Sequence, residues 1–332
     1  MEMLSTSDTD LEKAAAALAA GLLVAFPTET VYGLGADAFN QSALARIFEA
    51  KGRPRFDPLI IHIAELDTIW KIVDESSLNK ATIERLSVLT ERLWPGPLTL
   101  ILPKCGEVPD LATSGLSTAA IRFPSHPVAQ KLIRLSTGAV AAPSANLFGR
   151  LSPTRAAHVK AQLGDKVDYI IDGGKTTVGL ESTVLDLSGD VPKILRQGGI
   201  EREKIEALIG PVEISSDSPS ETPFSPGQLK SHYAPRTPLV LCKRGEMDAA
   251  PFAPREGRLY FSSPKTEGIT ESIIEDRTRV LSEAGNLTEA AANLFDCLHE
   301  LDSMGLDFIR AEEAPGCGLG EAINDRLRRA AH

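Results

Sequence analysis

The fold of this chain is decided by residues 22–63, LLVAFPTETVYGLGADAFNQSALARIFEAKGRPRFDPLIIHI. The opening apolar run is followed by the polar triplet TET at 28–30 and then by Gly33 and Gly35. This order predicts a buried strand that opens into a polar loop, with a turn at the two glycines. A second apolar strand is expected at 59–63. The polar loops next to the two strands are therefore expected to lie close together.

The loop before the second strand carries three cations between two prolines. Lys51, Arg53 and Arg55 alternate with other residues, and Pro54 and Pro58 restrict the backbone around them. Cations held in a short, stiff loop lose little entropy when they bind a polyanion, so a phosphate ester is the expected ligand. The alternative is an ordinary solvated basic turn.

Composition limits the class of protein. The chain has 332 residues, which favours two domains over one core. Its net charge of −10 argues against a protein that coats nucleic acid non-specifically. The absence of a long apolar run predicts no membrane segment, and the acidic N-terminus is unlike a leader peptide. The scattered cysteines form no paired motif and indicate a reducing cytoplasm: Cys105, Cys242, Cys297 and Cys317.

Helix and strand signals alternate through the first part of the chain, which predicts a mixed α/β sheet. We expect a catalytic domain at 8–212, a Ser, Pro and acid-rich linker or lid at 213–236, and a smaller α/β domain at 237–332. Helices are expected at 10–20, 42–50, 69–73, 83–93, 287–304 and 320–329, and a further helix is expected within FPSHPVAQKLIRLS (123–136) after the turns at Pro124 and Pro127. Strands are expected at 98–102, 118–122, 139–142, 168–172, 183–187, 193–196, 239–242 and 257–261.

Two familiar nucleotide motifs do not fit. Gly33, Gly35 and Ala38 satisfy G-x-G-x-x-A, but no acidic residue closes a second strand about twenty positions later, as a dinucleotide fold requires. The run GGKT at 173–176 resembles the end of a P-loop, but Tyr169 occupies the position of its first glycine.

Polar residues instead gather at the ends of the expected strands. Each has an ordinary alternative, such as a turn cap for Ser144, a surface ion pair for Arg196 or strand polarity for Ser182. Together they indicate one site that works by positioning and charge stabilisation, without a nucleophile or a metal cage. The members of this group are Thr118, Arg122, Ser144, Asn146, Ser152, Ser182 and Arg196.

The order of these motifs resembles one family. FPTETVYGLGADA, KGRP with PLIIHI, WPGPLTLIL, STAAIRFPSHP, APSAN and GLESTV look like the YrdC-like family, the threonylcarbamoyl-AMP synthases. SPGQLKSHYAP and the C-terminal part resemble its longer, two-domain members. The resemblance implies a YrdC-like mixed twisted sheet with flanking helices, followed by a smaller Rossmann-like α/β domain.

The resemblance also implies an activity, which is condensation of L-threonine, bicarbonate and ATP to threonylcarbamoyl-AMP and pyrophosphate. Mg²⁺ would arrive with ATP, and no cofactor would be permanently bound. The product would pass to threonylcarbamoyl transferase proteins and through them to tRNA, with no membrane partner.

The family pattern assigns roles to individual residues. Catalysis would rest on Lys51 and Arg53. Threonine would be held by Thr30, His62, Arg122, Ala142 and Ser182. ATP would be held by Arg53, Asp57, Thr118, Ser144, Asn146, Ser152, Arg196 and Tyr233. Asp57 departs from the asparagine that many relatives carry, and a carboxylate beside a triphosphate weakens binding unless it contacts ribose or Mg²⁺.

Two alternatives belong to other classes. An RNA-binding module would show a steeply salt-dependent affinity for tRNA, and the net charge makes it the weaker choice. A carbamoyl-transfer domain would turn over carbamoyl phosphate, but the acylphosphatase and zinc-finger segments expected of such proteins are missing. Within the synthase interpretation, the segment around Lys230, His232 and Tyr233 is expected to close over ATP.

Overall fold

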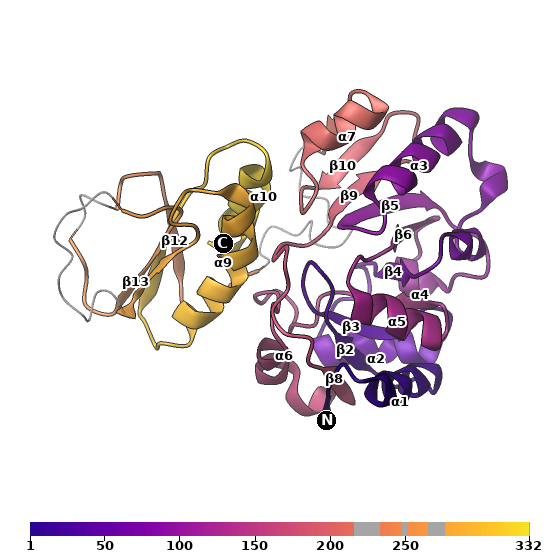
Figure 1. Cartoon of the computed structure of the whole chain (residues 1–332), viewed down its shortest axis with the longest axis horizontal. Coiled ribbons are helices and arrows are strands. Elements are labelled where there is room, and N and C mark those ends of the chain that lie inside the picture. Colours follow the sequence, from indigo (N-terminus) through magenta and orange to yellow (C-terminus); the bar gives the residue numbers. More distant parts are fainter. Residues whose placement is uncertain (216–232, 248–250, 265–275, 332) are drawn as a thin grey trace. The chain divides into compact units, whose positions relative to one another are not determined.

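The computed structural model describes residues 1–215, 233–247, 251–264 and 276–331, which form two compact units (Figure 1). The first unit contains the described residues of Met1–Phe148, Pro153–Thr177 and Glu181–Leu229. The second contains those of Gly149–Ser152, Val178–Leu180 and Lys230–His332. Most of the expected linker, including Lys230 and His232, lies outside the described residues.

The first unit is built on a mixed sheet, as the sequence predicts. Among the described residues its strand order is β1-β8-β2-β3-β7-β4-β6-β5-β9-β10-β11. The strands are β1 (Glu2–Leu4), β2 (Val24–Phe26), β3 (Gly33–Asp37), β4 (Ile60–Ile63), β5 (Leu98–Pro103), β6 (Thr118–Arg122), β7 (Ala139–Ala141), β8 (Tyr169–Ile171), β9 (Thr183–Asp186), β10 (Lys193–Arg196) and β11 (Glu213–Ile214).

Helices flank this sheet. They are α1 (Asp8–Ala19), α2 (Gln41–Lys51), α3 (Lys80–Leu93), α4 (Asp110–Thr113), α5 (Pro127–Leu135), α6 (Ala156–Leu163) and α7 (Arg202–Ile209), with short 3₁₀ turns η1 (Leu66–Lys71), η2 (Glu75–Ser77) and η3 (Gly164–Lys166). The piece expected to be helical at 69–73 is therefore mostly a 3₁₀ turn. The sequence patterns do not predict α4, α6, α7, β1 or β11, which are short or weakly periodic.

The turn expected at Gly33 and Gly35 is wrong, because both residues lie in strand β3, antiparallel to β2. A Cβ on Gly35 would lie 2.8 Å from the ring of Phe26 and 2.9 Å from Val140. The glycine therefore marks a close approach between neighbouring side chains and not a turn, which is the second common reason for glycine in a strand.

The two faces of the sheet differ because side chains alternate along each strand. Ile61, Leu100 and Ile121 belong to the main hydrophobic core. Residues one position away face the opposite side, where Ile60, Ile101, Ala120 and Val184 form a small separate apolar cluster. The polar residues of the predicted site lie beside this second cluster.

The second unit contains a parallel sheet, which confirms the expected smaller α/β domain. Among the described residues its order is β12-β15-β13-β14, and each pair of neighbouring strands in that order is parallel. Its elements are β12 (Leu239–Cys242), β13 (Glu256–Tyr260), β14 (Thr278–Val280), α9 (Leu287–Asp302), β15 (Phe308–Glu312) and α10 (Leu319–Ala330). Strands β14 and β15 were not anticipated.

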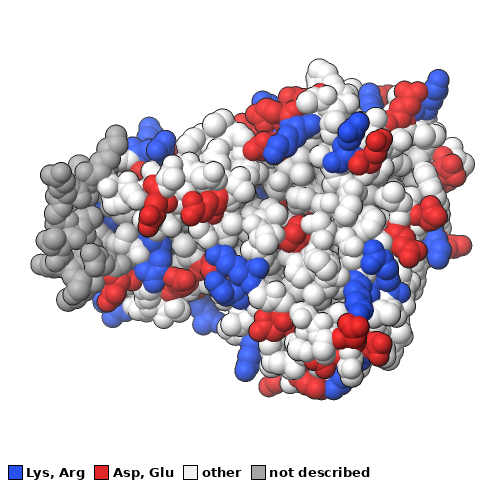
Figure 2. All heavy atoms as spheres, viewed as in Figure 1, with Lys and Arg blue, Asp and Glu red and all other residues white. Residues whose placement is uncertain are grey.

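On the face shown in Figure 2, acidic and basic side chains are interspersed over the described surface without a broad basic field. Among the described residues, no helix is both long and apolar enough to cross a membrane.

Candidate functional site

The register of three neighbouring strands builds a polar row on one face of the first unit's sheet. His62 on β4 is paired with Arg122 on β6, and Arg122 is paired with Thr99 on β5. The hydroxyl of Thr99 lies 2.7 Å from the hydroxyl of Ser182, which precedes β9. Paired residues on adjacent strands point to the same side, so segments far apart in sequence meet here.

Arg122 is engaged by the polar triplet that follows β2. Its Nη2 lies 2.7 Å from Oε1 of Glu29, and its Nη1 donates to Oγ1 of Thr30 at 2.9 Å. The hydroxyls of Thr28 and Thr30 lie 2.8 Å apart. The guanidinium and the carboxylate are each less than 10% exposed, so the ion pair is shielded from water.

His62 is buried and neutral near physiological pH. Burial lowers the pKa of its imidazole to about 3, and the charge of Arg122 acts in the same direction. Its Nδ1 lies 3.1 Å from the carbonyl oxygen of Ile60, and its ring packs edge-on against Phe26. A neutral imidazole can orient a hydroxyl or amine without adding charge beside Arg122.

Lys51 joins the basic loop to the SAN segment after β7. Helix α2 begins at the side-chain cap of Asn40 and ends at Gly52, whose φ of 63° only glycine adopts readily. This termination directs Lys51 inward, where its Nζ donates to the carbonyl oxygens of Ser144 and Asn146. Burial, reinforced by the charge of Arg53, holds the pKa of the Lys51 ammonium well below its ordinary value.

Arg53 and Asp57 form a buried ion pair with 2.8 Å between Nη2 and Oδ1. Arg53 also donates to the backbone oxygens of Asp57 and Pro58, so the loop folds around its own arginine. Burial raises the pKa of the Asp57 carboxyl, and the nearby charges of Arg53, Lys51 and Arg196 oppose that rise. These charges therefore lie close together.

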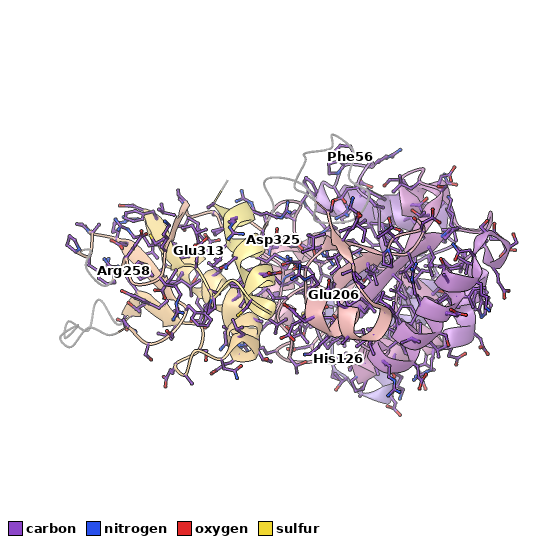
Figure 3. The ribbon with its side chains drawn as sticks, turned by 90° about the horizontal axis from the view of Figure 1, so that it is seen from above. Phe56, His126, Glu206, Arg258, Glu313 and Asp325 are labelled. Atoms are coloured by element: carbon purple, nitrogen blue, oxygen red, sulfur yellow. The ribbon has the colours of Figure 1, made fainter. Side chains whose placement is uncertain are left out.

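Only two of the loop's three cations turn inward. Arg55 is exposed and lines a surface pocket with Gln41, Ser42, Ala45 and Leu111. Phe56 next to it is also exposed (Figure 3). For Arg55 the alternative of a solvated basic residue is therefore the better description.

The remaining predicted residues of the first unit border the same row. At the end of β10, Arg196 donates to the backbone oxygen of Ser182 at 3.0 Å and to its hydroxyl at 3.1 Å. Thr118 begins β6 and is half-buried, two positions from Ala120 on the same face. Ala142 follows β7, and its amide donates to the carbonyl of Ile60.

Two predicted residues belong to the second unit. The carbonyl oxygen of Ser152 lies 3.0 Å from Nε2 of His299 on α9. Tyr233 is buried, with its ring 5.7 Å from that of Phe295 and 5.0 Å from the guanidinium of Arg326. The roles predicted for them toward ATP stay predictions.

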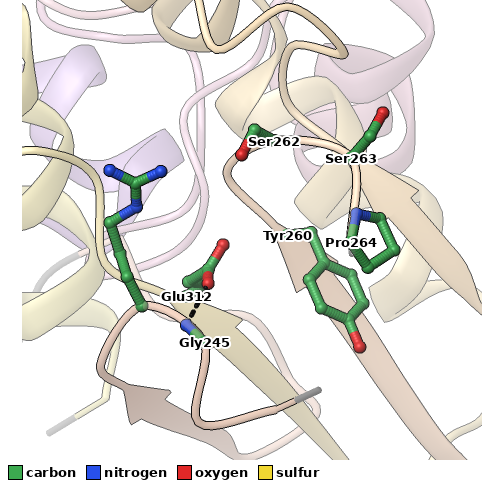
Figure 4. Close-up of a pocket in the computed structure, with 7 residues that line it drawn as sticks. Gly245, Tyr260, Ser262, Ser263, Pro264 and Glu312 are labelled. Atoms are coloured by element: carbon green, nitrogen blue, oxygen red, sulfur yellow. Dashed lines mark hydrogen bonds between the residues drawn. The ribbon is translucent and has the colours of Figure 1, made fainter. Parts of the chain in front are cut away.

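The second unit also has a pocket of about 350 Å³ at the carboxyl ends of its strands (Figure 4). Glu312 is one of its lining residues, with one carboxylate oxygen accepting from the Gly245 amide at 2.7 Å and the other from the Phe261 amide at 3.0 Å. Arg244 and Ser262 are among the other lining residues. No residue assigned to ATP or threonine is among those that line it.

Two residues of the site, Thr99 and Glu29, are not among those predicted from the sequence. Thr99 lies within the apolar strand TLIL, and its polarity at a position that alternates with buried leucines was the available signal. Glu29 was noted only as part of a polar loop, because nothing in the sequence ties it to Arg122, 93 positions later.

The site thus gathers buried cations around hydroxyls and neutral imidazole, an arrangement that holds anionic groups in fixed positions. Two family models together match nearly the whole chain. Residues 16–198 match the Sua5, YciO and YrdC family model, described as "Telomere recombination". Residues 200–332 match the model described as "Threonylcarbamoyl-AMP synthase, C-terminal domain".

Several relatives match nearly the whole chain. Threonylcarbamoyl-AMP synthase of Bacillus subtilis is 43% identical over 99% of this chain and 94% of its own length. Threonylcarbamoyl-AMP synthase of Pyrococcus abyssi is 44% identical over 93% of this chain and 90% of its own length. The crystal structure of P. abyssi Sua5 complexed with L-threonine superposes with a TM-score of 0.88, at 39% identity, covering 100% of this chain and 98% of that one.

The fold and the site define a nucleotide-using transferase built on a YrdC-like sheet. The chain belongs to the Sua5-type, two-domain branch of the threonylcarbamoyl-AMP synthase family, as the resemblance in its sequence predicted.

Proposed function

We propose that this enzyme condenses L-threonine, bicarbonate and ATP to threonylcarbamoyl-AMP and pyrophosphate, for threonylcarbamoyladenosine formation on tRNA. The observation that carries the proposal is the pair of adjoining groups in the first unit. One is the row of His62, Arg122 and Ser182, and the other is the buried cluster of Lys51 and Arg53. The relative crystallised with L-threonine makes threonine the expected amino acid.

In this proposal each group has a distinct task. Arg122 binds the carboxylate of threonine, because a guanidinium can form two parallel hydrogen bonds with it. The neutral imidazole of His62 and a pocket wall at Ala142 orient the remainder of the amino acid. A buried polar partner for the side-chain hydroxyl favours threonine over valine, which would leave that partner unpaired.

The triphosphate is assigned to the second group. The carbamate oxygen formed on threonine attacks the α-phosphorus, and pyrophosphate leaves with charge stabilisation from Lys51 and Arg53. Mg²⁺ bound to the phosphates would supply further neutralisation. Asp57 fits such an ion, because neither of its buried carboxylate oxygens has a well-formed hydrogen bond among the described residues. Arg53 must then share that carboxylate with the metal.

The proposal also includes the cellular compartment and the partners of the enzyme. The free cysteines Cys105, Cys242, Cys297 and Cys317 suit a reducing cytoplasm. A protein of the threonylcarbamoyl transferase class would receive the labile product. Direct tRNA binding is the weaker alternative, given the net charge of −10.

The test is a pyrophosphate-release assay with each substrate omitted in turn. We expect release only when threonine, bicarbonate, ATP and a divalent cation are all present, with threonylcarbamoyl-AMP formed in equal amount. Carbamoyl phosphate should not be consumed. Equal release without threonine would exclude the synthase and leave an ATP pyrophosphohydrolase.

A further inference from the structure

Glu29 is a buried carboxylate at the site for which the family pattern assigned no role. It follows strand β2 and is 5% exposed. Arg122 reaches Oε1 at 2.7 Å, while Thr30, the next residue, accepts from the same guanidinium. The loop therefore places one anion against the cation that is proposed to bind the substrate carboxylate.

The hydrogen-bonding demand of Glu29 is not met by the described residues. An ionised carboxylate offers about four acceptor positions. Neither oxygen has a partner of good hydrogen-bond geometry in the described parts of the chain, and the contact of Oε1 with Arg122 is an ion pair. Burying a charge in this condition is unfavourable unless a donor arrives with the ligand. Oε2 thus requires an additional cationic or N–H donor.

The other polar groups near Glu29 do not supply that donor. Burial lowers the pKa of His126, against a smaller opposing effect from Glu29, and its Nδ1 accepts from the amide of Val128. His62 is neutral as well. The hydroxyl of Thr28 donates to the carbonyl of Val31. The charge opposite Glu29 is therefore that of Arg122.

A zwitterionic amino acid complements this pair of charges. Its carboxylate pairs with Arg122 and its amino group with Glu29, so the site stays electrically balanced when the ligand enters. We propose that Glu29 binds the amino group of the amino acid substrate and so selects α-amino acids over 2-hydroxy acids. This inference rests on the proposed function, because it takes the substrate to be threonine.

The test compares two ligands on three full-length proteins by titration calorimetry. The ligands are L-threonine and 2,3-dihydroxybutanoate of matching stereochemistry, in which a hydroxyl replaces the amine. The proteins are wild type, Glu29→Gln, and Glu49→Gln as a control on an exposed glutamate of α2. We expect Glu29→Gln to weaken L-threonine binding by roughly 10- to 100-fold, as for loss of a charged hydrogen bond. The affinity for the hydroxy acid should fall by less than about threefold.

Each other outcome is decisive. An equal loss for both ligands would make Glu29 only a support for Arg122, and an unchanged affinity for threonine would exclude contact. Wild type that binds neither ligand would instead contradict the proposed function. If Glu29→Gln unfolds, Glu29→Asp serves in its place. Its shorter carboxylate should likewise reduce the preference of the protein for threonine over the hydroxy acid.

Discussion

At the scale of single residues, the basic loop is more than a set of surface charges. Arg53 and Asp57 have side chains that are 3% and 0% exposed, and the loop backbone caps the same guanidinium. The family pattern assigns Arg53 a role in catalysis and in ATP binding. Its burial against a carboxylate makes it part of the stability of the loop as well, because a buried charge depends on its partner.

We therefore expect Arg53→Ala to affect both turnover and stability. Turnover should fall by about two orders of magnitude, the scale for loss of one positioned donor in a transition state. The free energy of unfolding should fall by about 3–5 kcal/mol, because Asp57 is left buried without its counter-ion. Pyrophosphate release and urea denaturation measure the two effects.

The double variant Arg53→Ala/Asp57→Asn separates the two effects. Removing the unpaired charge of Asp57 should restore most of the stability but none of the turnover. Restored turnover in the double variant would show that Arg53 acts only by neutralising Asp57. Unchanged urea denaturation of Arg53→Ala would show that this ion pair adds nothing to the fold.

At the scale of elements, the end of helix α2 and the close packing of strand β3 position the residues of the site. Helix α2 is capped by Gly52 in the left-handed conformation, which turns Lys51 toward the carbonyls of Ser144 and Asn146. On the face of the sheet that carries His62, Gly35 lets β3 pack against the ring of Phe26. The loop after β2 is therefore positioned by a glycine outside the site.

Gly35→Ala is expected to destabilise the first unit by about 1–3 kcal/mol, the usual result of adding a methyl group to a well-packed core. The new Cβ would meet Phe26 and Val140 at less than 3 Å. The control is Gly189→Ala, where an added Cβ has no neighbour within 4 Å and φ is not in the left-handed range. Urea denaturation should separate the two variants, and equal stability would contradict the packing argument.

At the scale of the whole molecule, the units are not successive blocks of sequence. The second unit includes Gly149–Ser152 and Val178–Leu180, which come from within the range expected for the catalytic domain. An added Cβ on Gly179 would lie 2.5 Å from the Cα of Ala292 on α9, so this segment packs directly on that helix.

A chain ending at Val212 should accordingly be less stable than its size suggests. It would expose Leu151 and Leu180, which are 2% and 0% exposed in the full chain. Each buried leucine is worth at least about 1.5 kcal/mol. A loss of about 3 kcal/mol should lower the melting temperature by roughly 6–12 °C for a domain of this size.

Replacing both leucines with serine provides the matched control. The double substitution should lower the melting temperature of the full chain but leave that of the truncated chain nearly unchanged. A truncated chain that melts like the full-length protein would show that the two segments contribute nothing through the second unit.

The sequence by itself determined the family and those elements that carry strong local signals. Alternating apolar positions and proline or glycine breaks placed β6, β10 and β12 at their observed bounds, because these signals are local. The motifs KGRP and APSAN marked the basic loop and the polar segment after β7 as parts of the family pattern. The resemblance carried by the ordered motifs also predicted the two-domain family that the comparisons establish.

The tertiary structure alone decided which of these residues meet. Glu29 pairs with Arg122, which is far from it in sequence. Arg53 turns inward to Asp57 while Arg55 stays exposed, and Gly179 packs on α9. The register of strands and the geometry of helix ends bring these positions together. A sequence pattern records the chemistry of each position along the chain. Which charges neutralise one another depends on distances across the sheet and through the core, and these are set only when the whole chain is packed.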